Sequence, residues 1–503
     1  MKKFTEQELV RRDALEKIKE MGINPFPAEE FPVNSSSSLI KESFDNKKKP
    51  ISETIIAGRI MSRRIMGKAS FISLKDHEGE IQVYINRDEI CPGEDKKEYN
   101  EFFKKLLDIG DIIGVKGEVF ITKVGEISVK AKSIKLLAKS LKPLPVVKKD
   151  SEGKIFDEFK NTELRYRQRY LDLIVNDDSW VVFEKRTEVY NIIRERFNKN
   201  GFLEVETPIL QPIPGGALAR PFVTHHNTLD IPLYLRIANE LYLKKLIVGG
   251  KKGVYEFAKD FRNEGMDKTH NPEFSMLELY VAYKDYFWMM NFTERLLEEI
   301  VQKTHKTTKI SYDNKEINFK SPYKRVSFFD LIKKETGDDV SKLNTQELYI
   351  YCKKRGIEAT KKMGRGKLLD SVFGEFCEPK LIQPTFIIDY PVEMSPLTKK
   401  HRITPGVTER FELFINGKEI ANAYSEQNNP IEQRKSFERQ MDLLKKGDDE
   451  AMIIDYDFLT SMEYGMPTTA GIGIGMDRLI MLLTNKNSIQ DVLFFPQMKP
   501  LKK

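Results

Sequence analysis

Residues 255–280 combine an arginine, a histidine and aromatic rings in an order that suits a nucleotide. An apolar run leads into Arg262 and Glu264, a polar loop contains His270, and Phe274 opens a second apolar run. Such a hairpin offers a guanidinium for a phosphate, a second polar donor and a ring on which a base can stack. Taken singly, Arg262 would more often form a structural ion pair and Phe274 would more often be core, so the prediction depends on their combination.

Residues 470–483, AGIGIGMDRLIMLL, form a second stretch of this kind. A glycine-rich run that includes Gly473 and Gly475 leads into an apolar helix with Arg478 in its first turn. Glycines allow the close approach of a flat ligand, and a helix N-terminus with an arginine favours an anion. The sequence contains no GxxxxGK[ST] pattern and no strand-linked GxGxxG pattern. The residues therefore predict a nucleotide site without a phosphate-binding loop of those kinds.

Composition limits the classes of protein that these motifs can serve. The chain has 503 residues, with 83 Lys and Arg against 76 Asp and Glu, and 40% of its residues are hydrophobic. These values predict a globular protein of roughly two to four domains. Its three scattered cysteines exclude a disulfide framework and a closely spaced thiolate zinc site, and they favour a reducing compartment. No apolar run approaches about 18 residues and no signal peptide is evident, so we expect no membrane partner and a cytoplasmic location.

The first third of the chain predicts a helix and a small barrel. Residues 1–53 read as an N-terminal helix, with Thr5 and Glu8 in capping-box positions, followed by an extended connector rich in Pro and Ser. Residues 54–140 contain five short β-branched runs with a helical segment at 94–107 after the third run. This is the layout of an OB-fold, which binds single-stranded nucleic acid or sugars, although a barrel without a ligand remains an alternative.

The rest of the chain predicts a larger domain of the α+β class. Residues 141–165 contain Pro143 and Pro145 and read as a linker, and residues 166–503 mix helices and strands without a regular βαβ alternation. Residues 201–210 predict a strand that ends in a Thr-Pro pair, and residues 320–385 predict a helical insertion of unassigned function.

Three stretches in this order, residues 201–210, 255–280 and 470–483, resemble motifs 1, 2 and 3 of class II aminoacyl-tRNA synthetases. With the OB-like domain, the resemblance points to the subclass that activates lysine, aspartate or asparagine. The stretches GGALARPFVTHHNTLDIPLYLRIANELYLKKL at 215–246 and ANAYSEQNNP at 421–430 are similar to bacterial-type lysyl-tRNA synthetases. The resemblance covers nearly the whole chain and implies a catalytic domain built on an antiparallel sheet flanked by helices.

The resemblance also implies an activity and its partners. Such an enzyme activates L-lysine with ATP to lysyl-adenylate and pyrophosphate, uses Mg²⁺, and then transfers lysine to the 3′ end of tRNA(Lys). It implies a homodimer formed through motif 1. Catalytic arginines are expected at Arg262 and Arg478. The ATP contacts implied are Arg262, Glu264, His270, Phe274, Gly475 and Arg478.

The remaining site residues that the resemblance implies fall into three groups. The lysine contacts are Gly216, Glu240, Glu278, Tyr280, Asn422 and Glu426. The magnesium ligands are Glu412 and Glu419. The anticodon contacts in the OB-like domain are Arg64, Phe71, Gln82 and Glu126.

Several alternatives remain open at the level of sequence. An asparaginyl- or aspartyl-tRNA synthetase would share the motifs, although the acidic excess around the amino acid opposes a substrate with a carboxylate side chain. A catalytically silent nucleic-acid-binding relative and a ligase that attaches lysine to a protein are further alternatives. For Glu426, the competing interpretation is a structural ion pair with a base such as Arg410 or Arg434.

Overall fold

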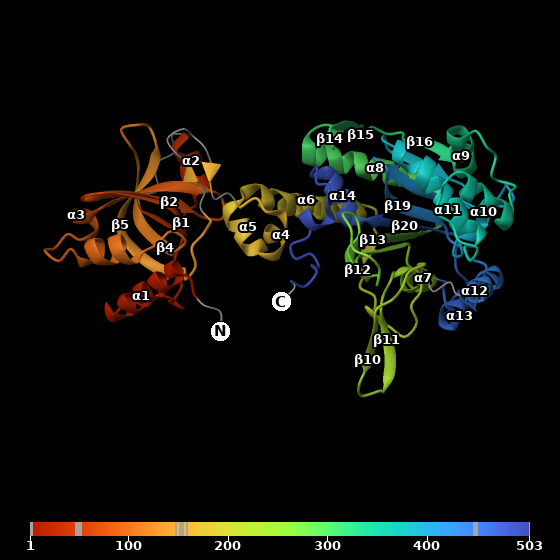
Figure 1. The fold of residues 1–503 in the computed structure, drawn as a ribbon, viewed down its shortest axis with the longest axis horizontal. Coiled ribbons are helices and arrows are strands. Elements are labelled where there is room, and N and C mark those ends of the chain that lie inside the picture. The colour runs from red at the N-terminus through yellow and green to blue at the C-terminus, as the bar shows by residue number, and fades with distance from the viewer. Residues whose placement is uncertain are drawn as a thin grey trace. The chain divides into compact units, whose positions relative to one another are not determined.

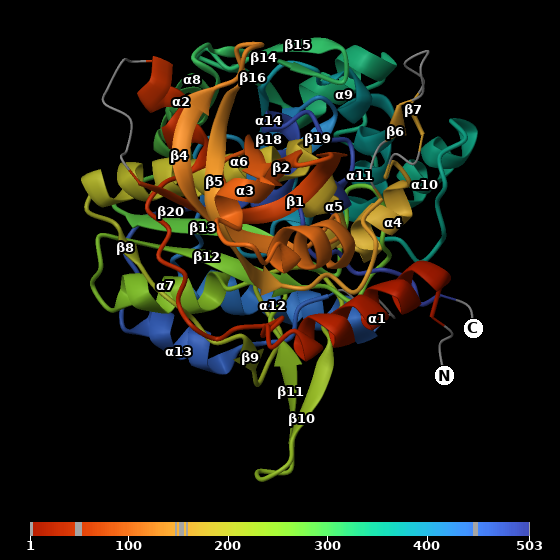
Figure 2. The same cartoon turned by 90° about the vertical axis from the view of Figure 1, so that its left-hand side faces the viewer.

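The computed structural model describes residues 4–45, 53–145, 148–149, 155–156, 159–445 and 451–501, which form two compact units, Met1–Asn161 and Thr162–Lys503 (Figures 1 and 2). Part of the predicted linker at 141–165 lies outside these residues. Within it, β6 (Lys148–Lys149) pairs with β7 (Ile155–Phe156), and α4 (Thr162–Arg167) begins the second unit. In the described chain, no helix is long and apolar enough to cross a membrane.

The first unit is a closed five-stranded barrel in the order β1-β2-β3-β5-β4, with the predicted helical segment after the third strand. Residues alternate between buried and half-exposed along β2 and β3, so one face of each strand fills the barrel and the other faces outward. The five strands are β1 (Thr54–Met66), β2 (Ala69–Lys75), β3 (Glu80–Asn86), β4 (Ile112–Ile121) and β5 (Ile127–Ala138). The helical segment consists of α3 (Arg87–Ile90) and a π-helix, η1 (Glu98–Leu106).

The N-terminal segment contains two helices instead of the one that the sequence predicts. The first, α1 (Glu6–Glu20), has the expected capping box. The second, α2 (Ser37–Asp45), lies in the stretch predicted as an extended connector, so that prediction is wrong for these residues. The carboxylate of Asp76 accepts hydrogen bonds from the N–H and Oγ of Ser37, at 2.6 and 2.7 Å. A partner 39 residues away thus holds the start of α2, and local composition does not reveal it.

The second unit is built on an eight-stranded sheet in the order β16-β17-β18-β19-β20-β13-β12-β8. Its central pairs are antiparallel, as expected, but the pairs at its two edges, β16 with β17 and β12 with β8, are parallel. The strands are β8 (Leu203–Glu204), β12 (Gly253–Phe261), β13 (Glu273–Ala282), β16 (Lys324–Ser327), β17 (Thr385–Ile388), β18 (Arg410–Ile415), β19 (Lys418–Ser425) and β20 (Thr469–Gly475).

Helices cover one face of this sheet and form the main core with it (Figure 1). The core helices are α6 (Asp177–Lys199), α8 (Tyr286–His305) and α14 (Met476–Leu483). The other helices of the unit, outside the insertion, are α5 (Arg169–Val175), α7 (Glu240–Val248), α12 (Pro430–Lys445) and α13 (Tyr456–Glu463). A small hairpin, β14 (Lys309–Tyr312) with β15 (Lys315–Asn318), adds to the same core.

The stretch 201–210 is not the continuous strand that the sequence predicts. Only β8 and β9 (Leu210–Gln211) are extended and paired there, and they belong to different sheets. Pro208, which has no N–H to donate to a strand ladder, lies between them. β9 pairs with β11 (Ile231–Leu235), which forms a projecting hairpin with β10 (Val223–His226) (Figures 1 and 2).

The predicted helical insertion is shorter than 320–385. Three helices, α9 (Phe328–Thr336), α10 (Thr345–Lys354) and α11 (Arg365–Phe376), lie between β16 and β17 and share a separate apolar cluster. Both flanking strands join the main sheet. Because β16 and β17 are only four residues long, their strand character is not visible in the sequence.

Candidate functional site

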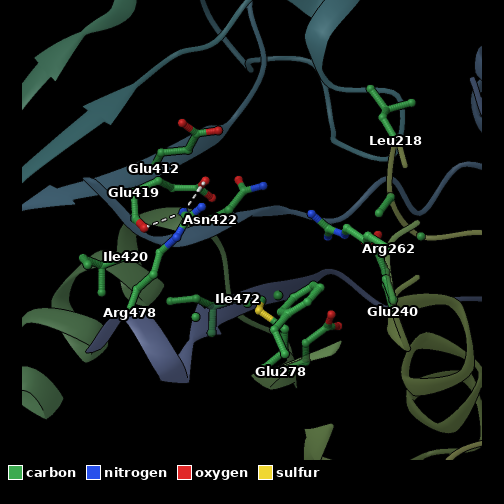
Figure 3. Close-up of a pocket in the computed structure, with 18 of the residues that line it drawn as sticks. Leu218, Glu240, Arg262, Glu278, Glu412, Glu419, Ile420, Asn422, Ile472 and Arg478 are labelled. Carbon is green, nitrogen blue, oxygen red and sulfur yellow. Dashed lines mark hydrogen bonds and ion pairs between the residues drawn. The ribbon is translucent and has the colours of Figure 1, made fainter. Parts of the chain in front are cut away.

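A cavity of about 510 Å³ lies on the sheet face opposite the helical core (Figure 3). Along β13, Leu277 and Leu279 point into the core, whereas Glu278 and Tyr280 line the cavity. The residues that line it include every predicted site residue of the second unit except Glu426, namely Gly216, Glu240, Arg262, Glu264, His270, Phe274, Glu278, Tyr280, Glu412, Glu419, Asn422, Gly475 and Arg478.

Two cross-strand rows of register partners explain the hollow in the sheet face. Residues in register on neighbouring strands point to the same face. The first row, across β18, β19, β20 and β13, is Arg410, Tyr424, Gly471 and Tyr280. The second row, across the same strands, is Glu412, Asn422, Gly473 and Glu278. Each row places a glycine between larger polar side chains, so β20 adds no side chain to this face, and Tyr280 and Glu426 approach closely over Gly471.

The β12–β13 hairpin supplies the predicted nucleotide-binding groups. Arg262 N–H donates to the carbonyl of Pro272 at 2.9 Å, which closes the base of the hairpin loop. The Arg262 guanidinium lies 5.0 Å from the ring centroid of Phe274, and its buried Nε has no hydrogen-bond partner among the described residues. The structural ion pair considered for Arg262 is absent from that part of the chain. An anion in the cavity would satisfy this donor.

Arg478 and His270 meet at one end of the cavity. An Nη of Arg478 lies 3.0 Å from Nε2 of His270, and the other Nη donates to the backbone carbonyl of Glu419 at 2.9 Å (Figure 3). The Nδ1 of His270 is 2.8 Å from the carboxylate of Asp267. Two groups that are 208 residues apart in the sequence therefore form one polar surface, and the positive charge of Arg478 suits the outer phosphates of a nucleotide.

Glu412 and Glu419 lie close together beside Arg478 (Figure 3). Glu412 accepts a hydrogen bond from Nη2 of Arg410 at 2.5 Å and one from the Tyr390 hydroxyl at 2.8 Å. Burial raises the pKa of Glu412 to about 7. The negative charge of Glu419 adds to this rise, and the positive charge of Arg410 offsets only part of it. A cation bound between these two neighbouring carboxylates would reduce the repulsion between them.

These two carboxylates fit a Mg²⁺ ion that is shared with a nucleotide. Magnesium prefers oxygen ligands and is usually held by one or two carboxylates together with substrate phosphates. Among the described residues, no group of three or more His, Cys, Asp or Glu side chains could hold a metal ion without a substrate. The donor set is therefore suited to an ion that arrives with ATP.

Arg410 fixes the orientation of Asn422. Its Nε donates to Oδ1 of Asn422 at 3.0 Å, while an Nη donates to the Met394 carbonyl at 2.6 Å and the Ser395 hydroxyl at 3.1 Å. Because the amide oxygen of Asn422 is engaged, its NH₂ group remains as a donor toward a substrate. The same arginine bonds Glu412, so it joins the acidic pair to the centre of the cavity.

The opposite end of the cavity is acidic, and its carboxylates are buried. Glu240 accepts a hydrogen bond from the Tyr424 hydroxyl at 2.7 Å, and Glu278 accepts one from the Tyr280 hydroxyl at 2.9 Å. Burial raises the pKa of Glu278 well above its usual value, and the neighbouring carboxylates add to this effect. Gly216, with a φ of +86°, lies beside Glu240; an added Cβ would come within 3.1 Å of the Glu240 Cβ.

Glu426 lies behind the cavity wall and forms an ion pair with Lys244. The competing interpretation, an ion pair with a protein base, therefore holds with Lys244 as the base. Arg410 and Arg434 do not bond Glu426, because they pair with Glu412 and Glu463. Its Oε1 would be 2.0 Å from a Cβ built on Gly471, which does line the cavity. A substrate at Gly471 would therefore lie next to Glu426.

Sequence reasoning missed several groups that the structure brings into the site. They are Lys244, Tyr390, Arg410, Tyr424 and Gly471. A signal existed for Tyr424, since Asn422, Tyr424 and Glu426 alternate as one face of a strand does. Gly471 lies in the glycine-rich run at 470–483 that the sequence already indicates. The roles of Lys244, Tyr390 and Arg410 also depend on partners distant in sequence, which are Glu426, Glu412 and Asn422.

The first unit presents an outward aromatic surface. Phe71 of β2 is half-exposed, so it is not a core residue, and its ring centroid is 5.1 Å from that of Tyr84. Tyr84 in turn lies 5.8 Å from Phe120, which extends the surface beyond the predicted residues. Gln82 donates to Ser128 Oγ at 2.9 Å on the same sheet face. Exposed aromatics of this kind provide stacking platforms for bases.

The other two predicted anticodon residues are exposed at the strand ends. Arg64 is the register partner of Phe71 across β1 and β2, and Glu126 precedes β5. All four predicted positions thus lie outside the barrel core.

Comparisons with known proteins match both units of the chain to known families. A family model described as tRNA synthetases class II (D, K and N) matches residues 161–499, and one described as OB-fold nucleic acid binding domain matches residues 54–137. The chain is 61% identical over 503 residues to a lysine–tRNA ligase of Christiangramia forsetii, which covers 100% of this chain and 88% of the relative.

Two further relatives are similar over nearly the whole chain. A lysine–tRNA ligase of Porphyromonas gingivalis is 60% identical over 500 residues, 99% of this chain and 86% of the relative. One of Azobacteroides pseudotrichonymphae is 58% identical over 499 residues, 99% of each chain. With its nucleotide-binding hairpin, glycine-rich strand and OB-fold, the chain belongs to the class II tRNA synthetases of the D, K and N subclass.

Proposed function

We propose that this chain is a lysine–tRNA ligase, which joins L-lysine and ATP to give lysyl-adenylate and pyrophosphate and then transfers lysine to tRNA(Lys). The observation that carries the proposal is the acidic end of the cavity, where Glu240 and Glu278 face the space beyond Arg262. Such an arrangement suits a substrate with two ammonium groups and one carboxylate. The three named relatives support the same substrate.

The proposed first step is an in-line displacement at the α-phosphate of ATP. A lysine carboxylate oxygen bonds to the phosphorus, and the bond to the pyrophosphate oxygen breaks. Arg262 holds the α-phosphate and stabilises the charge that develops on it, while Phe274 stacks on adenine and Glu264 contacts its edge. Arg478 and His270 hold the outer phosphates. In the second step a ribose hydroxyl of the tRNA attacks the lysyl carbonyl, and AMP leaves.

Glu412 and Glu419 would hold Mg²⁺ against the phosphates. A bound ion would neutralise the negative charge of the phosphates. The protein's own contribution is Arg410, whose direct hydrogen bond and positive charge favour the ionised form of Glu412. Tyr390 supports the same carboxylate from the other side.

Lysine would lie between two acidic contacts. Gly216 and Glu240 would bind its α-amino group, Asn422 its carboxylate end, and Glu278 and Tyr280 its ε-ammonium group. Glu426 would complete the ε-ammonium contact next to Gly471. A substrate with a carboxylate side chain would meet repulsion here, which disfavours aspartate.

The first unit would bind the anticodon of tRNA(Lys) through Phe71, Gln82, Arg64 and Glu126. Stacking on Phe71 gives affinity for any base, so selectivity would come from edge contacts such as those of Gln82. Three buried free cysteines are consistent with the cytoplasmic location that we still predict.

We also propose a homodimer formed around β8 and β9. Several large apolar side chains there are exposed in the single chain, including Leu203, Ile209 and Leu210 at 48%, 45% and 49%. Apolar surface of this kind is a feature of interfaces, and a two-fold contact is the commonest geometry of small oligomers. A fully active monomer at micromolar concentration would contradict this assembly.

The deciding experiment is ATP–pyrophosphate exchange with each of the twenty amino acids. Lysine alone should support rapid exchange. Exchange with asparagine or aspartate instead would place the chain elsewhere in the subclass, and no exchange with any amino acid would favour a silent nucleic-acid-binding relative.

A further inference from the structure

Lys244 lies on α7, one helical turn after Glu240, and its side chain is completely buried. Its Nζ forms ion pairs with the carboxylates of both Glu240 and Glu426. It also lies 5.5 and 5.9 Å from the ring centroids of Tyr424 and Phe458. Lysine is almost never fully buried unless it is paired. Lys244 is not among the described residues that line the cavity, so it reaches a substrate only through the two glutamates.

The charges at the acidic end balance only when Lys244 is counted. Glu240, Glu278 and Glu426 would face the two ammonium groups of lysine, and Arg262 lies at the carboxylate side. Together with Lys244 these groups leave one net negative charge, which equals the net positive charge of the lysine zwitterion. Without Lys244 a second negative charge would remain in a dry site, where unpaired charges are costly.

We propose that Lys244 is a positioning residue for lysine selectivity, which supplies the positive charge between Glu240 and Glu426 and holds them at a fixed separation. The inference rests on the proposed function, which places the α-amino group at Glu240 and the ε-ammonium group at Glu426. One ammonium group bonded to both carboxylates fixes the distance between the two ends of the substrate. The cavity therefore suits a diamino acid of the length of lysine.

The environment of Glu426 predicts that the loss of Lys244 changes the pH dependence of lysine use. Burial raises the pKa of Glu426 well above its usual value, and the charge of Lys244 opposes this rise. The ionisable groups that face Glu426 come from α7, β13 and β19; they are Lys244, Glu240, Tyr280 and Tyr424. Lys244 is the one cation in this set, so a neutral residue there leaves Glu426 protonated up to a higher pH.

The test compares Lys244→Met with Lys245→Met in lysine-dependent pyrophosphate exchange. Lys245 is the adjacent residue, and its substitution removes an ion pair with Asp457 at 2.6 Å that is more exposed and lies outside the cavity. Lys244→Met should raise the lysine KM at least about tenfold and leave the ATP KM nearly unchanged. The acid limb of the pH profile of kcat/KM for lysine should move to higher pH, and the preference for lysine over ornithine should fall. Lys245→Met should match the wild type in all four measurements.

A double variant keeps the inference testable if Lys244→Met folds poorly. Lys244→Met combined with Glu426→Gln removes a cation and an anion together, so its melting temperature should recover while the lysine KM stays high. A folded single variant with unchanged lysine KM and pH profile would overturn the inference, and so would a double variant with a normal lysine KM. Wild-type protein that fails to exchange with lysine would instead refute the proposed function.

Discussion

Replacing Gly471 by alanine should block the ε-ammonium end of the cavity. A Cβ at this position would lie 2.0 Å from Oε1 of Glu426 and 2.5 Å from Cε1 of Tyr280. Heavy atoms cannot approach so closely, so one of these two buried side chains must move. Both have fixed partners, since Glu426 pairs with Lys244 and the Tyr280 hydroxyl donates to Glu278.

The size of the effect follows from this crowding. Overpacking a closely packed site usually costs about 1–3 kcal/mol. If the displaced groups are the ones that bind the ε-ammonium, the cost appears in lysine binding, and about 1.4 kcal/mol corresponds to a tenfold change. We therefore expect the lysine KM of Gly471→Ala to rise by roughly one to two orders of magnitude.

The matched comparison is Gly473→Ala, two residues along the same strand. A Cβ there would be 3.0 Å from Cε of Met276, the mobile end of a flexible side chain, and 3.9 Å from Cγ of Glu278. It should raise the lysine KM much less than Gly471→Ala does, because the end of the Met276 side chain can move aside without displacing Glu278. Lysine and ATP KM values, measured with melting temperatures, separate the two variants. A stable Gly471→Ala protein with an unchanged lysine KM would refute the placement of lysine beside Glu426.

Three further predictions concern the metal end, the centre and the anticodon surface. Glu412, with a pKa of about 7, is protonated below that pH. The Mg²⁺ concentration for half-maximal exchange should therefore rise up to about tenfold per pH unit as the pH falls below 7. If this concentration does not change between pH 8 and 6, Glu412 is not a metal ligand. Arg410→Lys should raise both the lysine KM and the Mg²⁺ requirement, because an ammonium cannot bond Asn422 and Glu412 with the same geometry; a change in one alone would show that Arg410 does not link them. Phe71→Ala should weaken tRNA charging by about 1–3 kcal/mol and leave pyrophosphate exchange intact, and equal losses in both assays would indicate a structural role.

The parts of the site that sequence predicts are those with a short-range pattern. The hairpin from Arg262 to Phe274 and the glycine strand before Arg478 each contain their chemistry within about 20 residues, and the structure places both at the cavity. Lys244 shows the limit. Its spacing from Glu240 predicts an ion pair along a helix, but nothing local indicates that Glu426, 182 residues later, shares the same ammonium.

The spacing of Glu419 and Asn422 shows a second limit, because three residues along a regular strand should point to opposite faces of the sheet. Both nevertheless line the cavity. The register of β18 and β19 pairs Leu413 with Ala421 but Phe414 with Glu419, so Ile420 is an extra residue, a β-bulge. A bulge shifts the alternation by one residue and re-aims the side chains that follow it. One strand can thus hold the proposed metal ligand on one side of the bulge and the proposed amino-acid contact on the other, which would bring the phosphates and the lysine carboxylate to the same place for the displacement.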